Sequence, residues 1–198
     1  MSKHWDAFFN YKLFIMKKLT FIFPAIALAI VFGSCERSFE EVIFRDEKLS
    51  MKRTNYTGSE LRTDGYYIKY DTISGEVWAA TQFLYRNGVS CNGHYFSLSE
   101  NELSEFEEKY ADGSFYKDSY SNKLLWHVFQ IEGNTIVFEG WTHDHDGKYS
   151  TYKQYGTILN DTTFHIYKDV FKEEKALDNT FHFKPFAPKP DSTNIYIK

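Results

Sequence analysis

Short β-prone runs alternate with turn residues from Leu61 onward, and this alternation limits the possible folds more than any other feature. Tyr, Phe and Trp together make up 19% of the sequence, and these residues favour the half-buried, pleated surface of a sheet. Eight runs are predicted as strands: 66–70, 77–86, 89–97, 124–131, 135–141, 149–159, 162–170 and 179–186. We therefore expect an all-β domain.

The connections between these runs are short, which predicts antiparallel hairpins. Asn87 and Gly88 separate the second and third runs, and Asn-Gly is typical of a two-residue type I′ turn. Successive hairpins leave two open edges unless the sheet closes, so we expect an eight-stranded antiparallel barrel, with a two-sheet sandwich as the alternative. Apolar alternation is clear at Ile136 and Phe138, but neither face of run 149–159 is apolar.

One helix is expected among the strands. Ser99 and Glu102 have the spacing of a capping box, in which each side chain bonds a backbone amide of the first helical turn. Apolar residues then recur at helical spacing, at Leu103, Phe106 and Tyr110. We predict one short amphipathic helix at 99–111 that covers one side or end of the sheet, followed by a polar loop.

The N-terminal part of the chain has the order of a secretory signal. Lys17 and Lys18 precede an apolar run at 19–32, which Gly33 and Ser34 close immediately before Cys35. The run is shorter than the ~18–20 residues needed to cross a bilayer. A cysteine after small residues resembles a bacterial lipobox, so Cys35 is the predicted lipid attachment site. The alternative is an uncleaved anchor helix.

These features divide the chain into four parts. Residues 1–15 precede the cationic start and are interpreted as a start-site overrun, and residues 16–34 as the lipoprotein signal peptide. Residues 35–60 have no sustained apolar period and are expected to be a tether. Residues 61–198 form the predicted β-barrel domain, which is long enough for one core of ordinary size.

Charge and cysteine content exclude some classes of protein. The net charge is −4 and no basic run occurs, which argues against a nucleic-acid-binding protein, because such proteins need a basic face. The chain has two cysteines. If Cys35 carries lipid, Cys91 has no partner for a disulfide, and we expect it to be a buried small apolar residue.

Three stretches carry a resemblance to a known group. They are WHVFQIEGNTI at 126–136, GTILNDTTF at 156–164 and PKPDSTN at 188–194. In these stretches the chain resembles a group of uncharacterised Bacteroidota lipoproteins. The resemblance implies a lipocalin-like (calycin-type) β-barrel, and it implies no activity, cofactor or catalytic residue.

The aromatic residues suggest a ligand site inside the barrel. Such side chains can line a cavity for an apolar molecule, or they can simply fill the core. The candidate ligand-lining residues are Tyr66, Phe83, Trp126, Phe138 and Phe164.

Polar clusters provide weaker candidates. His143, Asp144, His145 and Asp146 are metal-ligand types, but zinc needs three or four ligands in a suitable geometry, and a solvated loop is the simpler interpretation. Four histidines fall within predicted strands, where each could be a base inside the barrel or a residue on its outer face: His94, His127, His165 and His182. No nucleophile elbow, phosphate loop or Cys-X-X-Cys motif is present, so we expect neither an enzyme nor a cofactor or metal.

The sequence thus predicts an outer-membrane lipoprotein of the cell envelope, bound to the membrane through its lipid. Its barrel is expected to take a small hydrophobic ligand. The alternative is a structural or interaction protein with a solid barrel, whose loops 111–123 and 142–148 dock a protein partner.

Overall fold

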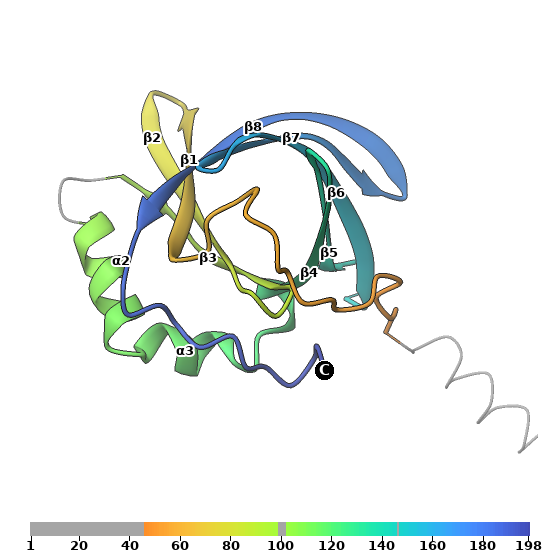
Figure 1. Cartoon of the computed structure of the whole chain (residues 1–198), viewed down its shortest axis with the longest axis horizontal. Helices are drawn as coiled ribbons and strands as arrows, with labels where there is room; N and C mark the ends of the chain where they lie inside the picture. Colours follow the sequence, from red (N-terminus) through yellow and green to blue (C-terminus); the bar gives the residue numbers. More distant parts are fainter. Residues whose placement is uncertain (1–45, 99–101, 146) are drawn as a thin grey trace, which may run out of the picture. The chain divides into compact units, whose positions relative to one another are not determined.

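The computed structural model describes residues 46–98, 102–145 and 147–198, and it shows a closed antiparallel barrel of eight strands. Each strand pairs with its neighbours in sequence, and β1 also pairs with β8 (Figure 1). The strands are β1 (Gly65–Ile73), β2 (Glu76–Leu84), β3 (Val89–Ser97), β4 (Trp126–Glu132), β5 (Thr135–His143), β6 (Tyr149–Asn160), β7 (Thr163–Phe171) and β8 (Glu173–Pro185). The predicted all-β, lipocalin-like barrel is confirmed, and the sandwich alternative is wrong.

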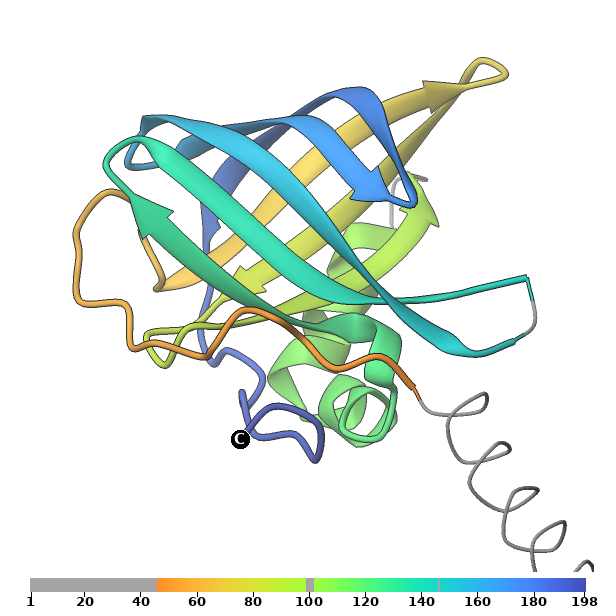
Figure 2. The ribbon, with the colours of Figure 1, turned by 90° about the vertical axis from the view of Figure 1, so that its right-hand side faces the viewer.

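The up-and-down order of the strands gives the barrel two different ends (Figure 2). The β1–β2, β5–β6 and β7–β8 connections lie at one end, which we call the open end. The β2–β3, β4–β5 and β6–β7 connections lie at the other, which we call the closed end.

The hairpin turns differ from the prediction in detail. The turn at Asn87 and Gly88 is not type I′, because only Gly88 has a positive φ, of 79°. The Gly88 amide donates to the Tyr85 carbonyl at 3.0 Å, as in a longer hairpin that ends in a left-handed residue. Ser74 and Gly75, between β1 and β2, both have positive φ and meet the requirement for a type I′ turn instead.

Helices cover one side of the barrel, and there are more of them than the sequence predicts. α2 (Glu102–Ala111) corresponds to the expected helix, whose predicted capping residues 99–101 lie outside the described residues. The expected polar loop after it contains α3 (Ser114–Ser119) and the short 3-10 helix η1 (Lys123–Leu125). Phe115 of α3 is buried against the barrel. No helix among the described residues has the length and apolar character needed to cross a membrane.

Two apolar layers hold these elements together. The inner layer fills the closed-end half of the barrel, with Phe129, Phe138 and Phe164 at its centre. The outer layer lies between the outer face of β1–β4 and the helices, and Phe83 and Trp126 belong to it. The Trp126 indole donates to the Ser119 carbonyl at 2.8 Å, which fixes α3 on the sheet.

Residues 46–60, the last part of the expected tether, are bound to the barrel. They belong to the compact unit Asp46–Lys198 and run along its outside from the open end to the closed end (Figure 2). The Glu47 amide donates to the Tyr149 carbonyl at 3.0 Å, and the Tyr56 amide donates to the Arg86 carbonyl at 2.8 Å. We call residues 46–60 the strap.

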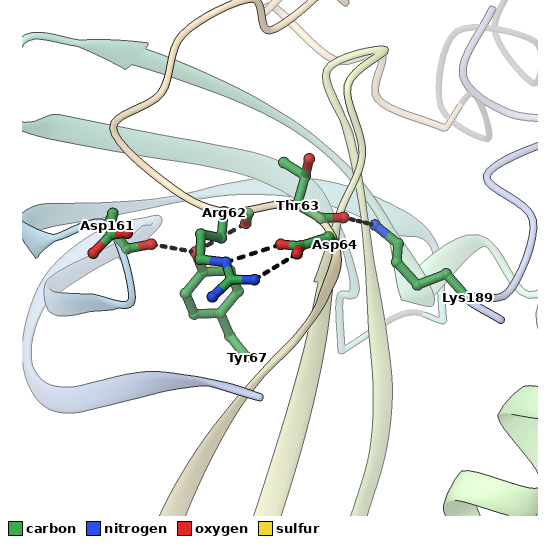
Figure 3. A network of polar contacts seen from close by, with 6 residues as sticks. All are labelled: Arg62, Thr63, Asp64, Tyr67, Asp161 and Lys189. Atoms are coloured by element: carbon green, nitrogen blue, oxygen red, sulfur yellow. Dashed lines mark hydrogen bonds and ion pairs between the residues drawn. The ribbon is translucent and has the colours of Figure 1, made fainter. Parts of the chain in front are cut away.

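Polar contacts close the barrel where the strap ends (Figure 3). Arg62 pairs with Asp64, and its backbone amide donates to the Asp161 carbonyl at 3.0 Å. The Tyr67 hydroxyl donates to the Arg62 carbonyl at 3.0 Å. From the C-terminal tail, the Lys189 amine donates to the Thr63 carbonyl at 2.7 Å. Backbone groups that the barrel leaves unpaired at this end are thereby satisfied.

Candidate functional site

The five predicted lining residues do not share one surface. Phe138 and Phe164 face the barrel interior, where they belong to the inner layer. Tyr66, Phe83 and Trp126 face outward and lie beneath the helices. All five are buried in packed side chains, and none of them lines any of the three surface pockets described below.

The inside of the barrel changes character between its two halves. Toward the open end the inward-facing residues are mainly polar. Nearer the closed end, where Gln82 pairs with Tyr67 and Ser90 with Leu84, the Gln82 amide donates to the Ser90 hydroxyl at 3.0 Å, and both side chains are buried. Lys69 donates to Asp71 at 2.7 Å and to Asn179 at 3.0 Å. Polar groups inside a barrel need partners, and here they find them across neighbouring strands.

His127 and Tyr152 form the centre of this polar half. His127 Nε2 lies 2.7 Å from the Tyr152 hydroxyl, and the Asn92 side chain also bonds Tyr152. Burial lowers the pKa of His127 to about 4, which the Leu125 carbonyl offsets only in part. The ring is therefore neutral at pH 7. Burial, followed by the charge of Asp169, raises the pKa of Tyr152.

Two further observations show how closely His127 is fitted. Gly140 is its register partner on β5, and a Cβ atom at Gly140 would lie 1.9 Å from His127 Cδ2. The absent side chain makes room for the imidazole ring. Among the described residues, His127 Nδ1 is buried without a hydrogen-bond partner of normal geometry. A buried polar atom without such a partner is costly, and the contact with the Leu125 carbonyl compensates for this only in part.

A pocket of about 430 Å³ opens beside this pair at the open end. This volume lies within the range of small-molecule sites, about 300–1,000 Å³. Its lining contains both polar and apolar residues. The lining residues are Leu124, Trp141, Thr142, Tyr152, Gln154, Asp169 and Phe171.

The polar wall of this pocket, which we call the mouth pocket, is held in place by its own contacts. The Gln154 amide donates to the Asp169 carboxylate at 3.1 Å, and His127 and Asn92 fix Tyr152 from behind. The wall presents a carboxylate and a hydroxyl, and the lining contains neither Lys nor Arg. It can therefore accept hydrogen bonds from a ligand, while it offers no cation to an anionic one.

Two other pockets lie near the closed end and carry less chemistry. One of about 440 Å³ separates the strap from the end of β4, between Tyr56 and Glu132. The other, of about 470 Å³, is a shallow surface beside Arg86. Polar groups on different strands converge only at the mouth pocket, among these three.

The remaining predicted sites have structural roles. His143 packs on Tyr149, and Asp144 pairs with Lys172 at 2.6 Å. Asp146 lies outside the described residues, among which no cluster of His, Cys, Asp and Glu could hold a metal ion. His165 faces outward and contacts Thr180 at 3.1 Å.

The structure describes one of the two cysteines, Cys91. Cys91 is buried, as predicted, and burial raises the pKa of its thiol. Cys35 lies outside the described residues.

Sequence reasoning named His127 only as one of four equal candidates and missed Tyr152 and Asp169. The signal was present in run 149–159, whose Ser150, Tyr152 and Gln154 share one polar face. This face turns inward, toward Gly140 and Thr142 of β5.

Comparisons with protein-family models, curated proteins and solved structures found no match to this chain.

Proposed function

We propose that this chain is a lipid-anchored protein of the cell envelope, of the outer-membrane lipoprotein type, that binds a small ligand in the mouth pocket. The observation that carries the ligand site is a preformed pocket of about 430 Å³ with a fixed polar wall. Phe138 and Phe164 belong to the inner layer that fills the closed-end half of the barrel. A ligand would therefore enter from the open end, where the mouth pocket lies.

The polar and apolar residues of the lining together define the class of ligand. Leu124, Trp141 and Phe171 offer apolar surface, which suits a small hydrophobic body. Tyr152 and Asp169 offer oxygen atoms that accept hydrogen bonds. The ligand that fits is a small hydrophobic molecule with a hydroxyl or amine donor, while a carboxylate would face the charge of Asp169.

A titration tests this ligand class. Decanol, decylamine and decanoate are added to the full chain carrying Cys35→Ser, and binding is followed by the intrinsic tryptophan fluorescence of the chain. We expect decanol and decylamine to bind more tightly than decanoate. Tyr152→Phe should weaken decanol binding by about tenfold, the worth of one buried hydrogen bond, while Tyr167→Phe should leave it unchanged. Equal binding of all three compounds would reject the proposal.

The anchor is supported by the sequence alone. A charged start, an apolar run and Gly33-Ser34-Cys35 stand in the order that lipoprotein processing requires, and two or three acyl chains give stable membrane attachment. Mass spectrometry of the membrane-extracted protein should show a chain that begins at acylated Cys35. Any other N-terminus removes the anchor from the proposal.

The filled inner layer favours a second candidate function, a solid barrel that docks a partner. α3 and η1 occupy much of the proposed docking loop 111–123, and Tyr120 between them is exposed. Absence of binding by every member of the ligand panel would support this function over ligand binding.

A further inference from the structure

The exposed apolar side chains of this protein are gathered at the open end of the barrel. Among the described residues, five of the nine large apolar side chains that are exposed belong to the β1–β2 hairpin or the end of β3. We call these five the apolar rim: Tyr70, Ile73, Val77, Tyr95 and Leu98. Exposed apolar side chains gathered in one region of a surface commonly mark an interaction site.

Two contacts between β2 and the end of β3 order the strands that carry the apolar rim. The Trp78 and Tyr95 rings stack with centroids 5.3 Å apart, and the Leu98 amide donates to the Val77 carbonyl at 2.7 Å. Ile73 pairs with Glu76 beside the turn at Ser74 and Gly75, and the β1–β2 hairpin projects beyond the barrel wall (Figure 2). Trp and Tyr favour the interface between membrane and water, and Ile and Val favour the apolar region below it.

The strap leaves the barrel at the same end. Asp46, its first residue, pairs with Lys123 at 2.8 Å, and Glu47 bonds Tyr149 at the start of β6. In the closed strand order, β6 lies opposite β2, so the strap and the apolar rim stand on opposite sides of the open end. The mouth pocket opens at this end too, and η1, β5, β6 and β7 line it, on the side where the strap leaves.

The length of chain before the strap limits how far the barrel can stand from its anchor. Cys35 and Asp46 are eleven residues apart in sequence, and a chain of that length spans at most about 40 Å when fully extended. A nine-residue strand is about 30 Å long, so turning the closed end to the membrane would require most of this chain to run back along the barrel. Chain entropy disfavours that arrangement.

We infer that the apolar rim docks on the lipid bilayer to which Cys35 is anchored, so that the open end and the mouth pocket face the membrane. The inference rests on the lipid attachment that is part of the proposed function. It also deepens that function, because a pocket open to the bilayer takes its ligand from the membrane. The ligand is then a membrane-resident amphiphile with a hydroxyl or amine headgroup.

The other connections at the open end carry polar and charged residues, which agrees with membrane contact through the apolar rim alone. Asp144, His145 and Lys148 lie in the β5–β6 loop, and Lys172 and Glu173 form the β7–β8 turn. These polar tips stay in water or at the headgroups, while Ile73 and Val77 enter the bilayer surface. Because Glu76 stands at the same tip as Ile73, a neutral lipid surface suits the contact better than an anionic one.

A site-specific probe tests the docking. Acylated protein with Ile73→Cys is labelled with the environment-sensitive fluorophore NBD and reconstituted in phosphatidylcholine vesicles, with and without lipid that carries a nitroxide on its acyl chain. The matched control is Leu159→Cys. Ile73 is 47% exposed and Leu159 58% exposed, and they lie at opposite ends of the barrel. Cys91 is buried and remains unlabelled.

We expect the emission of the label at position 73 to shift to the blue and to be quenched by the lipid nitroxide. The label at position 159 should show neither change. A water-like label at 73, or equal quenching at both positions, would overturn the inference. A label at 73 that is shielded but not quenched, together with cross-linking between copies, would also overturn it and assign the rim to a second copy of the chain. Mass spectrometry of the same sample reports acylation at Cys35 separately, so failure of the anchor is distinguished from failure of docking.

Discussion

His127 on β4 and Tyr152 on β6 bond each other across the intervening strand β5, with 2.7 Å between the imidazole Nε2 and the phenol oxygen. The contact passes over Gly140, the only kind of residue that leaves room for the ring. It ties the buried polar centre of the barrel to the wall of the mouth pocket. Two of the predictions below test this relationship.

The first prediction concerns acid. The pKa of His127 is about 4 in the folded chain, below the ordinary histidine pKa of 6.5, so between these values the unfolded chain binds a proton that the folded chain does not. Stability therefore falls as pH falls from 6.5 to 4, by up to about 3 kcal/mol. Urea unfolding at several pH values should show this loss, and His127→Gln should show much less of it.

A second variant separates the causes of this shift. Burial, not the Tyr152 hydroxyl, is the main cause of the lowered pKa of His127. Tyr152→Phe should therefore retain the steep dependence of stability on pH. Loss of that dependence in Tyr152→Phe would mean that the hydrogen bond controls the titration.

The second prediction concerns the space above Gly140. A Cβ atom in Gly140→Ala would lie 1.9 Å from His127 Cδ2, so the ring must move and break its bond to Tyr152. We expect a loss of about 2 kcal/mol of stability, as for other overpacked sites. The same change in a His127→Ala background should cost little. A double-mutant cycle by urea unfolding measures this coupling, and additive losses would contradict it.

The third prediction concerns Lys189 in the closed-end network of Figure 3. Its amine also donates to the Leu84 carbonyl at 2.7 Å, and burial lowers its pKa to about 8 from the ordinary lysine pKa of 10.5. Between these values the unfolded chain holds the proton that the folded chain releases, so stability rises with pH.

The expected contribution from Lys189 is up to about 3 kcal/mol over that pH window. The difference in unfolding free energy between the parent and Lys189→Met, measured from pH 7.5 to 9.5, isolates this contribution from that of the tyrosines. A difference that stays constant with pH would show that Lys189 does not titrate as described.

The fourth prediction concerns the strap. Glu139, 2% exposed, accepts hydrogen bonds from the Ser50 hydroxyl at 2.8 Å and from the Met51 amide. Glu139→Gln removes the carboxylate charge that strengthens both hydrogen bonds, which should cost about 1–3 kcal/mol. Hydrogen exchange of residues 46–56 should accelerate. Glu132→Gln, at an exposed position on β4, is the control and should leave strap exchange unchanged.

The sequence was sufficient for those parts of the fold that depend on local pattern. The eight strands follow from β-prone runs between turn residues, and closure follows because a series of hairpins would otherwise leave two edges. α3 was missed because six residues are too few for a helical period to be recognised. It forms because Phe115 is buried against the sheet.

The sequence by itself determined that the chain forms an antiparallel barrel and that Cys91 is buried, because strand propensity, turn chemistry and hydropathy act between neighbouring residues. Only the tertiary structure decided which face of each strand turns inward. Tyr66 and Phe138 look alike in sequence, yet one lies under the helices and the other inside the barrel. The mouth pocket was likewise beyond the sequence, because the contact between His127 and Tyr152 depends on strand register and on the missing side chain at Gly140.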